Sequence, residues 1–331
     1  TLFRSSAASD VYKRQGSQKP EHHDFEIAKG IKQAIQVYPM YENAIRYARK
    51  ESLPEHLKRV SELWARFNEV AIQNPNAWIQ DAFTAEEIRT PTDTNRRISF
   101  PYTKMMNANM SVDMGAAIIL CSVEKARELR IPEEKWVYPL AGVQGYDHFS
   151  ASVRENFHSS PGLGLVGKRV MELAKVSPEE IDYVDLYSCF PSAVQIAARE
   201  LGFSEERQLT VTGGLTFGGG PLNNYVMHAV ARTVELLRKA PGKKAFVSAN
   251  GGNLYKHVHC VYSSQAPEEP FQYENIQQEI DALPSRICLP EYDGKVEVES
   301  YSVMYTGEKP AIAHCSGITS DGARVWSNCY D

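Results

Sequence analysis

The stretch VTGGLTFGGGPLNNYVMHA, residues 211–229, places five glycines within the eight positions 213–220. Glycine allows positive φ angles and lets a neighbouring group approach the backbone closely. A helix-like run follows at once, so the sequence predicts a glycine turn that leads into a helix. The free N–H groups of such a turn suit an anion or an oxyanion, but a tight turn without a ligand explains the same glycines.

The composition is that of a soluble globular protein with a sizeable core. The chain has 331 residues, of which 43% are hydrophobic and 23% are charged, and its net charge is −5. This length favours about two domains. No basic stripe indicates nucleic-acid binding, and the apolar runs are too short to span a membrane. Scattered cysteines without C-x-x-C spacing, and no secretory signal, indicate a reducing cytoplasm.

The first fifteen residues, TLFRSSAASDVYKRQ, have the pattern of neither a signal peptide nor an amphipathic helix. They are similar to translated adapter sequence, so we treat residues 1–15 as a non-native leader and exclude them from fold reasoning. The expectation that follows is that Gly16 begins the coding sequence in mid-protein.

Strand and helix patterns divide the rest of the chain into four regions. Residues 16–96 are a helical region, in which Ser52 is the expected N-cap of a helix with an apolar stripe. Residues 97–265 alternate strands with helices, which predicts an α/β domain with a buried sheet. Within it, the run at 114–122 predicts a buried apolar segment. A proline- and acid-bearing linker at 266–294 then leads to short strands at 295–331, a small β-domain that we expect to be truncated.

Four motifs in this order resemble the second half of the thiolase superfamily. They are PYTKMMNANMSVDMGAAIILCS (101–122), DYVDLYSCFPSAVQIAARELG (182–202), TGGLTFGGGPLNNY (212–225) and FVSANGGNLYKHVHCVYSS (246–264). The likeness covers residues 97–264 and is greatest to acetyl-CoA acetyltransferases and thiolase-like proteins related to the sterol-carrier-protein thiolases. It implies an αβαβα layered fold of which this chain holds the second half only, with a helical loop region and a small C-terminal β-domain. The half with the nucleophilic cysteine is then missing, before residue 16.

The resemblance implies acyl transfer on a coenzyme A thioester, which is the substrate, with no cofactor. This chemistry needs a nucleophilic thiolate, an acid/base group at the α-carbon and donors to the thioester oxygen. Cys189 in LYSCF stands at the family's acid/base cysteine, but Tyr187 and Ser188 replace the family's His-Asp pair. A helix N-terminus favours a thiolate at Cys189, and the alternative is a small buried hydrophobe.

GGLTFGGGP matches the family's Gly-Gly-x-x-x-x-Gly-His-Pro pattern, with a glycine at position 220 in place of the catalytic histidine. Loss of one oxyanion donor costs roughly 2.7–4 kcal/mol. His228 is a candidate substitute, although a structural helix histidine is the favoured explanation. Asn223 is a candidate pocket residue that helix capping also explains. The loop glycines are the remaining candidates for CoA binding: Gly213, Gly214, Gly218, Gly219 and Gly220.

SANGGN matches the family's Cys-x-Gly-Gly-Gly loop, with an alanine at 249 where the other cysteine would stand. Asn250, Gly251 and Gly252 are therefore further candidates for CoA binding. KHVHC places His257 and His259 on one strand face, but without a third ligand a packed face is favoured over zinc, and we predict no metal site.

Two functions remain open. The first is a thiolase-family acyl-CoA acyltransferase, present as a fragment that lacks the nucleophile half. The second is a catalytically degenerate thiolase-like protein that binds an acyl-CoA or a partner protein, which the glycine at 220 and the alanine at 249 favour. The expected partners are acyl-CoA, the missing N-terminal half and a second copy of the chain. Cys189, the 218–220 turn and the 250–252 turn should meet in one pocket, since each ends a strand.

Overall fold

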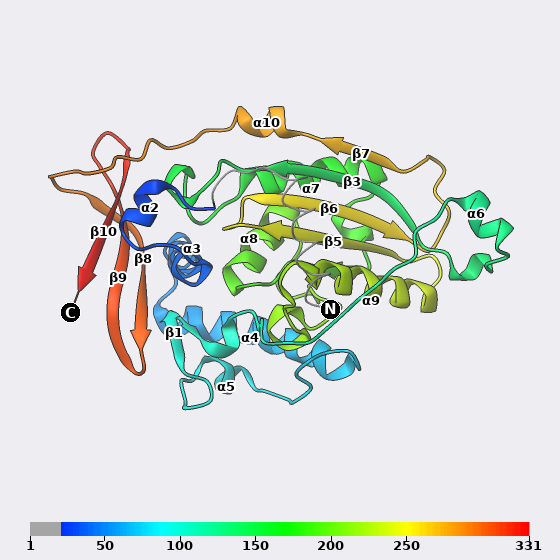
Figure 1. Cartoon of the computed structure of the whole chain (residues 1–331), viewed down its shortest axis with the longest axis horizontal. Coiled ribbons are helices and arrows are strands. Elements are labelled where there is room, and N and C mark those ends of the chain that lie inside the picture. Colours follow the sequence, from blue (N-terminus) through cyan, green and yellow to red (C-terminus); the bar gives the residue numbers. More distant parts are fainter. Residues whose placement is uncertain (1–20, 331) are drawn as a thin grey trace, which may run out of the picture.

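Two five-stranded sheets organise residues 21–330, the part of the chain that the computed structural model describes (Figure 1). The proposed leader at 1–15 lies outside the described residues. The main sheet has the strand order β4-β5-β6-β3-β7 and mixes parallel and antiparallel pairs. Its strands are β3 (Tyr138–Tyr146), β4 (Tyr183–Asp185), β5 (Lys244–Gly251), β6 (Lys256–Ser263) and β7 (Gln272–Asn275).

Helices lie against both faces of the main sheet. They are α7 (Pro161–Ala174) and α8 (Pro191–Leu201) on one face and α9 (Tyr225–Lys239) on the other. Two successive residues of β5 point to opposite faces of the main sheet, because side chains alternate along a strand. Phe246 packs against Phe203 beyond the end of α8, and Val247 packs with Tyr225 of α9. The α/β layered class predicted from the sequence is confirmed.

The second sheet, here called the tail sheet, is antiparallel and has the order β10-β9-β8-β1-β2. Its strands are β1 (Arg97–Phe100), β2 (Tyr102–Thr103), β8 (Glu297–Thr306), β9 (Lys309–Ile318) and β10 (Arg324–Tyr330). Residues 97–103, which we assigned to the α/β domain, therefore pair with the C-terminal strands. The linker expected at 266–294 likewise contributes β7 to the main sheet, followed by α10 (Gln277–Asp281).

Helix α3 (Ala34–Arg49) lies between the two sheets and packs on β8 and on α8. Its residues 37–45 are buried without a break. Ser300 Oγ of β8 donates to the Met40 carbonyl over 2.6 Å, which ties the tail sheet to the helix. Because buried polar groups need partners, the polar side chains of α3 must find them inside the molecule. Tyr38 and Glu42 are brought into the centre of the fold in this way.

The capped helix predicted at Ser52 is α4 (Leu53–Gln73), and this prediction is confirmed. Ser52 is the N-cap, and its amide donates to Glu55 Oε2 over 2.9 Å. The cap acts within one turn and the apolar stripe acts along one helix face, so neither signal needs a distant contact. The remaining elements are α2 (Asp24–Ala28), α5 (Ala85–Arg89), α6 (Val123–Glu128) and the short turns η1 (Lys104–Met106), η2 (Glu133–Lys135), η3 (Ala151–Val153), η4 (Pro178–Glu180), η5 (Gly214–Gly218) and η6 (Leu222–Asn224).

Residues 107–122 are an extended connection without helix or strand that runs to α6, at the right edge of Figure 1. We predicted a buried apolar segment at 114–122, and this prediction is wrong. Ile119 is 93% exposed and Leu120 is 79% exposed. An apolar run is buried only where another element packs on it, and no element between residues 21 and 330 covers these side chains.

Candidate functional site

Cys189 lies in the turn between β4 and α8, directly before the helix. The residue is half-buried, and the Asn250 amide donates to its sulfur over 3.8 Å. The Tyr38 hydroxyl and the backbone N–H of Phe190 are the other polar groups that act on this sulfur. Burial raises the pKa of the Cys189 thiol to about 12, even though these donors lower it. Cys189 is therefore a protonated thiol near neutral pH, suited to giving a proton rather than to attacking.

Tyr38 connects Cys189 to the turn at 250–252, and the sequence analysis missed it. Its hydroxyl accepts from Asn250 Nδ2 at 3.0 Å and lies 3.2 Å from the Gly252 carbonyl, to which it donates. Tyr38 is fully buried, and burial raises the pKa of its phenol well above the ordinary value. The structure thus brings Cys189 and the predicted residues Asn250 and Gly252 together, around a side chain from a distant helix.

The glycine loop 213–220 is buried along its whole length. Gly213 has φ +98°, and a Cβ there would lie 2.5 Å from Cβ of Ala71 on α4. The loop therefore needs glycine at this position both for its backbone angle and for the close approach of α4. The Gly220 N–H is also occupied, because it donates to the Asn109 carbonyl over 2.9 Å. Packing against neighbouring segments accounts for the glycines without a ligand.

The glycine loop reaches the Cys189 turn through backbone contacts. Leu215 N–H donates to Ser188 Oγ over 3.2 Å, and Ala108 N–H donates to the Cys189 carbonyl over 3.1 Å. The two turns are therefore neighbours, and the segment containing Ala108 bridges them.

Asp185, at the end of β4, holds the start of the glycine loop. Its Oδ2 accepts from the Val211 N–H and from Thr210 Oγ1, both at 2.9 Å, and its Oδ1 accepts from Tyr225 Oη at 2.9 Å. Thr210 Oγ1 in turn accepts from the N–H groups of Gly213 and Gly214. Burial raises the pKa of Asp185 to about 6, because its partners are neutral donors rather than cations.

Asp185 should make stability fall as the pH rises. The folded state binds this proton with a pKa of about 6, against the ordinary value of 3.8 that we assign to the unfolded chain. The Asp185 contribution is therefore fully present below about pH 4 and is lost by about pH 6, an effect of about 3 kcal/mol. Urea unfolding of wild type and Asp185→Asn at pH 4.5 and 7.5 measures it. We expect the free energy of unfolding of the variant, relative to that of wild type, to be higher at pH 7.5 than at pH 4.5. An equal difference between the two proteins at both pH values would contradict this.

The other predicted site residues lie elsewhere. Asn223 is exposed, and the side chain of Asn224 makes no capping hydrogen bond at α9. His228 lies on α9 with Nε2 3.5 Å from Asn224 Nδ2, and burial lowers its pKa. No hydrogen bond joins His228 to Cys189 within the described residues. Gly251 is half-buried in the hairpin of β5 and β6.

His257 and His259 are both buried on the inner face of β6. His257 Nε2 lies 3.2 Å from Asp147 Oδ2, and burial lowers the pKa of His259 to about 3. Between residues 21 and 330, no group of three or more metal-ligating side chains could hold an ion. The same residues contain no helix with the length and apolarity that crossing a bilayer requires. All six cysteines are free thiols.

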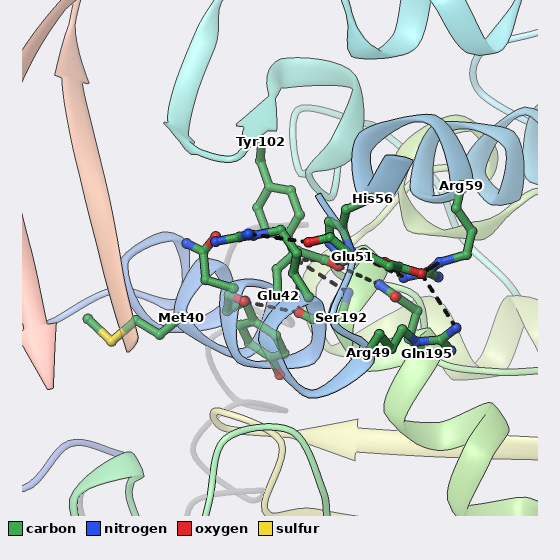
Figure 2. A network of polar contacts seen from close by, with 12 residues as sticks. Met40, Glu42, Arg49, Glu51, His56, Arg59, Tyr102, Ser192 and Gln195 are labelled. Carbon is green, nitrogen blue, oxygen red and sulfur yellow. Dashed lines mark hydrogen bonds and ion pairs between the residues drawn. The ribbon is translucent and has the colours of Figure 1, made fainter. Parts of the chain in front are cut away.

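A buried ionic network joins α3, α4 and α8 (Figure 2). His56 Nε2 is 2.7 Å from Glu42 Oε1, and His56 Nδ1 is 2.6 Å from Glu51 Oε2. Each ring nitrogen of His56 therefore lies against a carboxylate oxygen. Tyr102 Oη donates to Glu42 Oε2 over 2.7 Å, and Gln195 Nε2 donates to Glu42 Oε1 over 2.7 Å.

The ionic network reaches the site through Ser192 at the start of α8. Tyr102 Oη lies 2.9 Å from Ser192 Oγ, which donates to the Tyr38 carbonyl over 3.1 Å. Because Glu42 and Tyr38 are one turn apart on α3, the network sets where this helix lies against α8. It thereby sets the distance between Tyr38 and Cys189.

The comparisons with known proteins give consistent results. No protein-family model matches the chain. An acetyl-CoA acetyltransferase from Methanothermobacter thermautotrophicus is 25% identical over 202 residues, which are 56% of this chain and 51% of that protein. The chain thus spans about half the length of this curated relative. The Ltp2-ChsH2(DUF35) aldolase shares the fold, with a TM-score of 0.55 and 19% identity over 72% of this chain and 66% of that one.

The strongest of these similarities is to a monomeric SCP2-thiolase-like protein type 1 from Mycobacterium smegmatis. Its crystal structure superimposes with a TM-score of 0.86 and 32% identity, over 94% of this chain and 69% of that one. The layered fold agrees with the resemblance inferred from the four motifs. The chain belongs to the SCP2-thiolase-like proteins.

Proposed function

We propose that this chain acts on acyl-CoA thioesters in a thiolase-type acyl transfer, with Cys189 as its acid/base group. The observation that carries the proposal is the Cys189 sulfur at the start of α8, to which the Asn250 amide donates and on which Tyr38 and Phe190 also act. Membership of the SCP2-thiolase-like proteins and the similarity to an acetyl-CoA acetyltransferase support it. The CoA thioester is the substrate, and the proposal needs no cofactor.

In the thiolytic direction, the carbon–carbon bond of a 3-oxoacyl thioester breaks, and its electron pair moves onto the departing α-carbon as an enolate. The Cys189 thiol, protonated because its pKa is about 12, gives its proton to that carbon. The thiolate that remains takes the proton of the incoming CoA thiol, which attacks the acyl group held on a nucleophile. Position 220 has no side chain that could donate to the enolate oxygen.

The nucleophile in this proposal comes from a complementary thiolase-type N-terminal half. Uncovered apolar side chains support such a partner: Ile119 and Leu120 on the connection, Met227 on α9 and Val258 on β6. Exposed apolar patches often mark interaction surfaces. A second copy of the chain is the alternative occupant. The Ltp2-ChsH2(DUF35) aldolase shows that a protein of this fold is found in an assembly.

A second candidate function is binding of acyl-CoA, or of a partner protein, without turnover. Two observations favour it: the glycine loop is buried, and its Gly220 N–H is already bonded to the Asn109 carbonyl. An oxyanion at position 220 would then have neither a histidine side chain nor a free backbone N–H of the loop as its hydrogen-bond donor.

Hydrogen exchange at the α-carbon of acetyl-CoA separates these functions, because it requires the acid/base group but not the nucleophile. We expect the chain in D₂O to introduce deuterium into acetyl-CoA, faster as the pH rises, and to show no thiolysis of acetoacetyl-CoA by itself. Cys189→Ala should slow the exchange by about 100-fold or more. Cys260→Ala, which removes a half-buried thiol on β6, is the matched control and should leave it unchanged.

The results of the exchange and binding measurements together decide between the two functions. Binding of acetyl-CoA by calorimetry, with no exchange that depends on Cys189, would replace the acyltransferase proposal with the binding function. Absence of acetyl-CoA binding would contradict the acyltransferase proposal and the binding of acyl-CoA, and would leave the binding of a partner protein as the second function. Sedimentation velocity on the same preparations tests the partner surface, because uncovered apolar patches should cause association at micromolar concentration. A monodisperse monomer would contradict that part of the proposal.

A further inference from the structure

Tyr38 stands beside Cys189 although 151 positions separate the two residues in the sequence. Its hydroxyl carries one hydrogen, which it donates to the Gly252 carbonyl over 3.2 Å. Asn250 Nδ2 lies 3.0 Å from this hydroxyl and 3.8 Å from the Cys189 sulfur, so the hydroxyl and the sulfur lie on the same amide. When Cys189 is a neutral thiol, the carbonyl is the better acceptor for this hydrogen. When Cys189 is a thiolate, the charged sulfur becomes the stronger acceptor.

Several contacts hold Tyr38 in this position. Its ring stacks on Phe190, with centroids 4.4 Å apart and planes at 14°. Ser192 Oγ holds its carbonyl, and Ser192 is linked through Tyr102 to the buried carboxylate of Glu42. Because Phe190 before α8 and Ser192 in its first turn both contact Tyr38, the hydroxyl cannot move from the sulfur without disturbing the buried network.

The side chains that precede Cys189 are engaged elsewhere. Ser188 Oγ accepts from the Leu215 N–H over 3.2 Å, and Tyr187 packs edge-on against Tyr225, with ring centroids 5.5 Å apart. These two side chains therefore do not hold the sulfur of Cys189. The support present here comes from α3 and from β5.

We propose that Tyr38 is a positioning residue for Cys189, whose hydroxyl, together with the Asn250 amide, holds the sulfur and stabilises the thiolate left when the thiol gives its proton away. The inference rests on the proposed function, because it assigns Cys189 an acid/base cycle. It also makes a statement about the thiol alone that needs no acyl-CoA.

The groups around the sulfur make this dependence measurable. Two titratable side chains interact with Cys189: Tyr38 from α3 and Tyr187 from the same turn. Asn250 from β5 also contacts the sulfur and is neutral. The thiolate is therefore stabilised by neutral hydrogen bonds rather than by an ion pair. Removing one such donor should lower the thiolate fraction by about tenfold or more at any pH below the pKa.

The test is the alkylation rate of Cys189 by iodoacetamide at pH 9, followed on its own peptide by mass spectrometry. We expect Tyr38→Phe to slow alkylation by about tenfold or more, since phenylalanine keeps the stack on Phe190 but donates no hydrogen. Tyr41→Phe is the matched control, because Tyr41 is equally buried on α3 but donates to the Asn253 carbonyl over 2.9 Å. The exposed Cys121 serves as the internal standard in both variants.

Asn250→Ala provides a second variant, which should also slow alkylation of Cys189. Equal or faster alkylation in Tyr38→Phe would overturn the proposal, and so would the same loss in Tyr41→Phe. If acetyl-CoA exchange fails while Tyr38→Phe still slows alkylation, the proposed function falls and the pairing of Tyr38 with Cys189 stands. If exchange depends on Cys189 but alkylation is insensitive to Tyr38, the proposed function stands and the pairing of Tyr38 with Cys189 falls.

Discussion

Replacing His56 with alanine is expected to lower the free energy of unfolding by about 3–5 kcal/mol, the usual cost of removing one member of a buried ion pair. His56 is 1% exposed, and the Glu42 carboxylate beside it is fully buried. Burial alone would raise the pKa of Glu42, but hydrogen bonding to His56, the charge of His56 and donors such as Tyr102 bring it below its usual value. Without the imidazolium, the carboxylate must take up a proton or remain uncompensated.

Urea unfolding monitored by circular dichroism measures this change. Lys58→Ala is the control on the same helix, since Lys58 is exposed and pairs only loosely with Glu62 at 3.9 Å, and it should change little. Adding Glu42→Gln to His56→Ala should recover part of the loss, because it removes the charge left without a partner. A loss below about 1 kcal/mol in the single variant would show that the network contributes little to the fold.

Replacing Arg324 with methionine should also cost about 3–5 kcal/mol and should loosen the tail sheet from the main body. Arg324 on β10 is fully buried, and its Nε and Nη2 donate to the Glu299 carboxylate over 2.7 and 2.6 Å. Its Nη1 donates to three carbonyls of the main body, and its guanidinium lies 4.4 Å from the ring centroid of Phe157. One side chain thus satisfies a carboxylate and three carbonyls that have little access to water.

Limited proteolysis, together with urea unfolding, distinguishes a loosened tail sheet from a uniform loss of stability. We expect early cleavage between residues 282 and 296 in the variant, because this connection joins the tail sheet to α10. Arg324→Lys should be nearly as damaging, since an ammonium cannot form the bidentate pair and reach the carbonyls as well. Lys309→Ala, on an exposed position of β9, is the control. Unchanged unfolding of Arg324→Met would show that the two sheets hold together without it.

The elements predicted correctly are those whose signals are local. The Ser52 cap and its apolar stripe predicted α4, and a helix N-terminus was expected at Cys189, where α8 begins. The end of α8 at Gly202 could likewise be read from the sequence. In each case the residues that decide the structure lie within a turn or two of one another, so tertiary contacts only select what the local pattern already favours.

Predictions that depended on distant partners were less successful. The apolar run at 114–122 predicted burial, yet Ile119 is exposed, since burial requires a covering element that the run cannot specify. The glycines at 213–220 left a ligand loop and a tight turn open, and the sequence could not show that Ala71 of α4 approaches Gly213 closely. Tyr38 gave no signal, because a tyrosine in a buried helix has the same local pattern whatever its hydroxyl contacts.

The sequence by itself determined the α/β class, the order of the strands and helices along the chain, and the motifs that place Cys189 and Asn250 at strand ends. Only the tertiary structure decided that residues 97–103 join the C-terminal strands and that α3 lies buried between the two sheets. It also decided that Tyr38 and Glu42 stand behind the cysteine turn. The physical reason is that hydrophobic periodicity and capping act within a few residues, whereas the partner of a buried hydroxyl or carboxylate is set by how whole elements pack.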